Sequence, residues 1–110
     1  MSYSTTQELI QKITGRRIKS INIDVTIDEP YMLVSRTHEK NISILIEDSE
    51  LAIAKKDRYK TRITAIPIEK ITKITIDTLD DNTLDIWFTV NELLIYNIVV
   101  EMSAASLINK

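Results

Sequence analysis

Hydrophobic and polar residues alternate along much of this chain, which predicts β-strands. The segment 21–27 carries an aliphatic side chain at every second position, and this period of two is typical of a strand with one buried face. Similar alternation, or a short apolar run between turn residues, predicts further strands over 31–34, 42–46, 51–54, 61–66, 71–77, 84–90 and 93–100. Counting the short segment 31–34 as marginal among these eight, we expect about seven antiparallel strands.

Polar segments between these runs predict where the chain turns. Pro30 and Pro67 each close a strand, because proline cannot donate a hydrogen bond to a β-ladder. The charged stretch Lys55–Lys60 has no apolar rhythm and predicts a hairpin loop, and the polar stretch Ser35–Asn41 predicts a second loop. Asp80–Asn82 and Asn91-Glu92 predict two further reversals.

Short helices are expected at both ends. Thr5 and Glu8 have the spacing of a capping box, and Gly15 is placed where a helix commonly stops, so we predict a helix within 1–15. A helical spacing of three and four puts three apolar residues on its inner side, namely Leu9, Ile10 and Ile13. The tail 101–110 is predicted to be a short C-terminal helix.

The chain is expected to form one domain over 1–110, with a helix at 1–15, a β-sheet body at 18–100 and a helix at 101–110. Its 110 residues, 44% of them hydrophobic, suffice for one core. The fold class is therefore mainly β, as an α+β protein whose strands form a bent sheet, a small barrel or a sandwich. No repeat and no linker rich in Pro, Gly or Ser divides the sequence.

Composition favours a cytoplasmic location. Cysteine is absent, as is common in a reducing compartment, and no apolar run approaches the roughly 18 residues that a membrane-spanning helix needs. The net charge of −2 hides an asymmetry, because no Lys or Arg occurs between Ile74 and Asn109 while Lys and Arg are dense between Lys55 and Lys73.

The order of elements resembles the bacterial pleckstrin-homology-like domains. The resemblance rests on the turn Ile66-Pro67-Ile68-Glu69-Lys70-Ile71, on the strand Leu84-Asp85-Ile86-Trp87 and on the hairpin formed by Ser43–Ile46 and Leu51–Lys55, and it covers about residues 40–110. It implies a seven-stranded bent sheet capped by a helix and a binding or self-associating role without enzymatic activity. The sequence departs from the family in its added N-terminal helix and its short C-terminal one.

No catalytic group, metal site or cofactor is predicted. His38 is the only histidine and lies in the expected polar loop, without a nucleophile motif beside it. One histidine and no cysteine leave only carboxylates as zinc ligands, and the acidic turn lacks the glycine and terminal glutamate of a calcium loop. Gly15 is the only glycine, which excludes a phosphate-binding loop. We therefore expect that this protein is not an enzyme.

The strongest candidate for a partner-binding site is Trp87 with Leu93, Ile95 and Val99. The strand 93–100 is apolar on both faces, so both must be covered. Two alternatives remain at this point. Either the N-terminal helix covers this second face, or the face binds a protein partner or a second copy of the chain, for which Trp is a favoured anchor.

Two charged groups are secondary candidates. The cations Lys55, Lys56, Arg58 and Lys60 could contact an anion, including the headgroup of a peripheral anionic lipid, or could form a solvated loop. The carboxylates Asp77, Asp80, Asp81 and Asp85 could form an acidic surface. Such a surface suits a small phage-type inhibitor, for example an anti-CRISPR protein, that blocks the nucleic-acid groove of a host enzyme. The leading hypothesis is a non-catalytic module that binds protein or self-associates, without direct contact to nucleic acid.

Overall fold

The computed structural model describes residues 4–14, 16–27 and 31–103. One helix, α1 (Thr6–Ile13), precedes seven strands and one short 3-10 turn, η1 (Ile68–Lys70). The strands are β1 (Ile18–Ile27), β2 (Met32–Glu47), β3 (Glu50–Lys55), β4 (Arg62–Pro67), β5 (Ile71–Asp80), β6 (Thr83–Val90) and β7 (Leu94–Met102). The mainly β class with seven antiparallel strands is confirmed.

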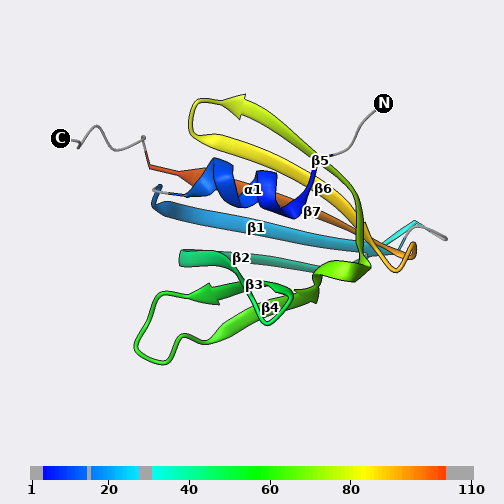
Figure 1. Cartoon of the computed structure of the whole chain (residues 1–110), viewed down its shortest axis with the longest axis horizontal. Coiled ribbons are helices and arrows are strands. Elements are labelled where there is room, and N and C mark those ends of the chain that lie inside the picture. The colour runs from blue at the N-terminus through cyan, green and yellow to red at the C-terminus, as the bar shows by residue number, and fades with distance from the viewer. Residues whose placement is uncertain (1–3, 15, 28–30, 104–110) are drawn as a thin grey trace.

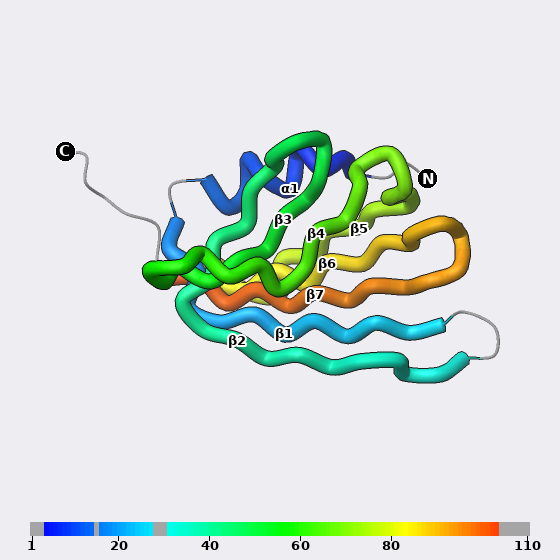
Figure 2. The backbone as a smooth tube through the Cα atoms, turned by 90° about the horizontal axis from the view of Figure 1, so that it is seen from below, coloured from blue at the N-terminus to red at the C-terminus, as the bar shows by residue number. Residues whose placement is uncertain are grey.

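All seven strands belong to one sheet in the order β4-β3-β2-β1-β7-β6-β5, and every neighbouring pair is antiparallel. The sheet bends strongly but does not close, because β4 and β5 lie at opposite ends of the order (Figure 1). The barrel and the two-sheet sandwich that the sequence also allowed are therefore not formed. The bend raises β3 and β4 toward the side of the sheet on which α1 lies (Figure 2).

The N-terminal helix forms as the capping box predicts. Thr5 is the N-cap, and its hydroxyl accepts a hydrogen bond from the backbone N–H of Glu8 at 3.1 Å. Leu9 and Ile13 are buried in the core, whereas Gly15, the expected helix stop, lies outside the described residues. The predicted C-terminal helix is not confirmed: Glu101 and Met102 are the last residues of β7, and 104–110 lie outside the described part of the chain.

The largest error of the sequence reading concerns β2. Two strands with a polar loop over 35–41 were expected, but the whole range Met32–Glu47 is one strand of 16 residues. The first part of this strand pairs with β1 and the last part pairs with β3. Cross-strand pairing of the backbone does not need apolar side chains, so the polar stretch, including His38, extends the strand rather than interrupting it.

Asn41 marks the point at which β2 changes partner. Its φ of 55° is left-handed, a conformation that asparagine tolerates better than most residues, and its carbonyl accepts from the Lys56 N–H at 2.7 Å. Ile42 is the first buried residue of β2 after this point. The core then lies between α1 and the inner face of the sheet, where Ile21, Ile53 and Phe88 are almost fully buried.

Candidate functional site

The face of the sheet that points away from the core is the best candidate for a binding surface. On β6 the buried residues Ile86 and Phe88 alternate with Asp85 and Trp87, and on β7 the buried Ile98 alternates with outward positions. We call this side of the sheet the outer face. Trp87 is 39% exposed there, while its strand neighbour Phe88 is 2% exposed.

Of the two alternatives for the second face of β7, cover by α1 is not the one that the structure shows. Leu9 and Ile13 of α1 belong to the same buried cluster as Phe88, so the helix packs on the inner face (Figure 2). Among the described residues no helix or strand lies over Trp87, so within this part of the chain nothing covers the second apolar face of β7. Ile95 and Val99 are half-buried there by their strand neighbours, and Leu93, in the turn before β7, is 53% exposed.

A hydrogen-bond network fixes the polar residues around Trp87. The Asn97 side-chain Nδ2 donates to Asp85 Oδ1 at 2.6 Å and to the Ile86 carbonyl at 3.2 Å. The indole N–H of Trp87 donates to Asp85 Oδ2 at 3.1 Å. Asp85, expected from the sequence as part of an acidic surface, therefore orients the candidate anchor residue.

A second hydrogen-bonded pair of side chains lies on the neighbouring strands β1 and β2. Asn97 lies opposite Asp24 of β1, and both carboxylate oxygens of Asp24 accept from Arg36 of β2, at 2.9 and 3.2 Å. The hydrogen bond to Asp24, together with its charge, raises the pKa of Arg36. One row further along, His38 Nδ1 is 2.7 Å from Asn22 Oδ1. The polar part of the outer face is thus largely satisfied by its own side chains.

Sequence reasoning missed one apolar contribution to this face. Leu33 of β2 pairs with Thr26 of β1, and Thr26 pairs with Ile95 of β7, so the three residues lie in one row across the sheet. Leu33 is 46% exposed, and its neighbours Met32 and Val34 are exposed too. Their apolar run was visible in the sequence, but only the register of β1 with β2 and β7 brings it near Ile95. We call Leu33, Trp87, Leu93, Ile95 and Val99 the outer patch.

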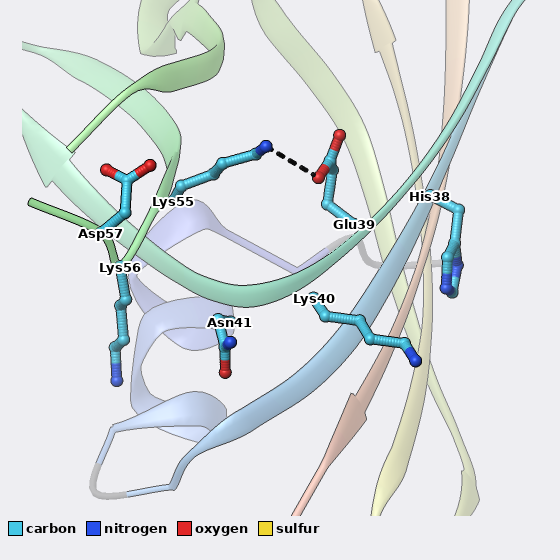
Figure 3. Close-up of a pocket in the computed structure, with 7 residues that line it drawn as sticks. All are labelled: His38, Glu39, Lys40, Asn41, Lys55, Lys56 and Asp57. Atoms are coloured by element: carbon cyan, nitrogen blue, oxygen red, sulfur yellow. Dashed lines mark ion pairs between the residues drawn. The ribbon is translucent and has the colours of Figure 1, made fainter. Parts of the chain in front are cut away.

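The four predicted anion contacts do not form a single cluster, because Lys55, Lys56 and Lys60 line a common pocket on the outer face of β3 whereas Arg58 does not. Lys55 forms an ion pair with Glu39 at 3.4 Å, and the Arg58 guanidinium lies 5.9 Å from the centre of the Tyr59 ring. A hollow of about 470 Å³ lies where β2 leaves β3, lined by His38, Glu39, Lys40, Asn41, Lys55, Lys56 and Asp57 (Figure 3). Lys56 extends away from the Lys55–Glu39 pair in this view (Figure 3). Arg58 lines neither this hollow nor the pocket on the outer face of β3.

The acidic residues lie on neighbouring strands. Asp77 of β5 is directly opposite Asp85 of β6, and Asp80 ends β5, where its carboxylate accepts from the Asn82 N–H at 2.7 Å. Asp81 lies in the turn between the two strands. Within the described part of the chain, none of these four carboxylates takes part in an ion pair. The structure therefore collects them along one side of the molecule.

Several other features bear on function. Among residues 4–14, 16–27 and 31–103, no group of three or more His, Asp or Glu is placed to hold a metal ion, and no helix is long and apolar enough to cross a membrane. Comparison of the chain with protein-family models, with curated proteins and with solved structures gives no match. The resemblance to pleckstrin-homology-like domains therefore remains a prediction.

Proposed function

We propose that this protein is a non-catalytic binding module that contacts a protein partner, or a second copy of itself, through the outer patch. The observation that supports the proposal best is the uncovered second apolar face of β7, flanked by the exposed side chains of Trp87 and Leu93. Exposed apolar patches rimmed by polar residues are typical of protein-interaction surfaces. Tryptophan in particular is enriched among residues that dominate binding energy.

The polar surroundings of Trp87 fit the same role. Protein interfaces combine an apolar centre with polar groups that are already hydrogen-bonded, because a buried polar group without a partner costs binding energy. Asp85 and Asn97 satisfy each other, as do Asp24 and Arg36. A partner could therefore cover these residues without leaving them unpaired. A pleckstrin-homology-like fold and a cytoplasmic location are part of this proposal.

Sedimentation velocity over a range of concentrations, combined with affinity capture from the source cells, tests this proposal. Wild type should self-associate or retain a defined protein, and Trp87→Ala and Leu33→Ser should each weaken that association by about tenfold or more. Tyr59→Ala is the matched control, because Tyr59 is 79% exposed in the β3–β4 loop and outside the patch. Association that is unchanged in both patch variants would contradict the proposal.

A second candidate function uses the acidic residues. Like charges directly opposite each other on neighbouring strands destabilise a sheet, and Asp77 and Asp85 hold such positions without an ion-pair partner among the described residues. The two facing carboxylates favour a partner with a basic surface. The second candidate function is therefore that of a small inhibitor that occupies the nucleic-acid groove of a host nuclease. The Asp80→Lys/Asp81→Lys variant should then lose competition with nucleic acid. Persistence of the competition in this variant would eliminate the alternative.

A further inference from the structure

The outer face of the β2–β3–β4 segment holds a pocket of about 420 Å³ that is separate from the outer patch. Ser43 and Leu45 of β2 alternate with the inward Ile42 and Ile44, so they lie on the outer side of the strand. Ala54 and Ala52 of β3 pair with Ser43 and Leu45, respectively. These four residues line the pocket and form its floor.

The pocket is hollow because three of its four floor side chains, Ser43, Ala52 and Ala54, are small. The neighbours of Ala52 along β3, Leu51 and Ile53, fill the core on the other side of the sheet. Ala52 also lies opposite Ala65 of β4, so the middle of this outer surface carries methyl groups only on both strands. The apolar floor is half enclosed by the β3–β4 loop, which contributes Lys56 and Lys60 to the lining.

The loop is held in place by backbone hydrogen bonds. Lys55 N–H donates to the Thr61 carbonyl at 2.8 Å, and Lys60 N–H donates to the Asp57 carbonyl at 3.2 Å. The Asp57 carboxylate in turn accepts from the Tyr59 N–H at 3.0 Å. Lys60 takes a left-handed φ of 50° within this arrangement. The cations at the rim are therefore attached to an ordered backbone, so less conformational entropy of the loop is lost when a ligand binds.

Two ammonium groups at the rim form no ion pair among the described residues, although the carboxylates Glu47 and Asp57 also line the pocket. Arg62 lines the pocket, but its guanidinium forms ion pairs with Glu47 at 2.8 Å and with Glu50 at 3.2 Å. The hydrogen bonds to these two carboxylates raise the pKa of Arg62. Lys55 is paired with Glu39. Within the described residues, Lys56 and Lys60 form no ion pair. The pocket thus combines an apolar floor with net positive charge at its rim.

We propose that this pocket binds a small soluble carboxylate with a compact apolar body. The carboxylate would lie between Lys56 and Lys60, and the apolar body would cover Ala52, Ala54 and Leu45. A carboxylate carries a single negative charge, which two ammonium groups beside Asp57 can balance, and the apolar floor suits an organic acid better than a fully hydrated phosphate. The proposal goes beyond protein binding by the outer patch and does not depend on it.

Titration of the full-length, ¹⁵N-labelled protein with 4-phenylbutyrate, followed by amide chemical shifts, tests the proposal. We expect saturable shifts at the floor residues Leu45, Ala52 and Ala54, with a dissociation constant of about a millimolar or lower. The uncharged 4-phenylbutyramide should bind about tenfold more weakly, because it lacks the charge-assisted contact. Inorganic phosphate, which lacks the apolar body, should not shift the floor amides.

Two variants separate the floor from the rim. Ala54→Leu fills the pocket from a half-buried position, and Lys56→Gln/Lys60→Gln removes both unpaired charges at exposed positions, where folding is least affected. Each should weaken binding of 4-phenylbutyrate about tenfold. The matched control is Lys70→Gln/Lys73→Gln, which removes two exposed cations outside the pocket and should leave binding unchanged.

Three outcomes would overturn the proposal. The first is binding that Ala54→Leu leaves intact while its melting temperature shows a folded protein. The second is an identical response to phosphate, which would indicate unspecific attraction to the loop. The third is an absence of carboxylate binding together with pelleting on phosphatidylglycerol vesicles that requires Lys56 and Lys60, which would assign the site to anionic lipid instead. None of these outcomes bears on Trp87, so failure here is distinguishable from failure of the outer patch.

Discussion

Trp87 and Asp85 are two residues apart on β6, and the indole N–H of the first donates to the carboxylate of the second at 3.1 Å. Both side chains lie on the outer face, so the bond restrains an aromatic side chain that no helix of the described ranges covers. An anchor residue that is ordered before binding loses less conformational entropy when a partner arrives. Asp85 therefore has a structural reason to be acidic that is independent of any basic partner.

This relationship predicts that Asp85→Ala loosens the indole. Trp87 is the only tryptophan, so its fluorescence reports on this position alone. We expect lower fluorescence anisotropy and more efficient quenching by acrylamide in the variant. Asp77→Ala is a suitable control, because Asp77 lies directly opposite Asp85 and carries the same charge without a hydrogen bond to the indole. Equal quenching in the two variants would contradict a specific role for Asp85.

The two faces of β6 predict stability losses of different size for neighbouring substitutions. Phe88 is 2% exposed and stacks on Tyr96 with ring centres 5.2 Å apart, so Phe88→Ala should lower the free energy of unfolding by about 3–5 kcal/mol. Trp87→Ala removes a larger side chain, but from the uncovered face, and should cost only about 1 kcal/mol. Urea denaturation measures both. A loss at Trp87 as large as that at Phe88 would show that the outer face is covered after all.

The left-handed backbone of Asn41 predicts a third effect. Asn41→Val should lower the free energy of unfolding by about 1–2 kcal/mol, because a β-branched residue is strained at positive φ. Asn41→Gly should be close to neutral, since glycine adopts this conformation without steric cost. Thermal unfolding of the two variants provides the comparison. Equal melting temperatures would argue against a left-handed residue at the point where β2 changes partner.

Tyr96 predicts a loss of stability at alkaline pH. Burial raises the pKa of Tyr96 above its usual value of 10.0, since the phenolate is poorly solvated at this site. The folded protein therefore holds this proton more tightly than the unfolded chain. The resulting stabilisation is complete below about pH 10 and is lost as the pH rises through the folded-state pKa. Tyr96→Phe should lose less stability than wild type above about pH 10, as measured by urea denaturation across this range. If wild type and Tyr96→Phe lost stability in parallel, Tyr96 would not be the cause of the loss at alkaline pH.

Much of the secondary structure was predictable because it depends on neighbours in the sequence. The capping pair Thr5 and Glu8 specified the start of α1. Alternation marked Trp87 and Phe88 as residues of opposite faces, and the reversal at Asn91-Glu92 formed with both residues at positive φ. The Lys55–Lys60 loop was also predicted from its lack of an apolar rhythm. These features require only local geometry, which residue type and spacing largely determine.

The tertiary structure alone decided where these elements meet. Alternation shows that Trp87 and Phe88 occupy different faces of β6, but not which face α1 covers, because that choice depends on contacts between residues far apart in the chain. The same limit applies to Leu33, which reaches Ile95 only through the register of β1 with both of its neighbours. It also applies to β2, whose polar first half is a strand because β1 supplies its hydrogen-bond partners. Sequence periodicity thus determined which side chains share a side of each strand, and long-range pairing determined which of those sides were left open.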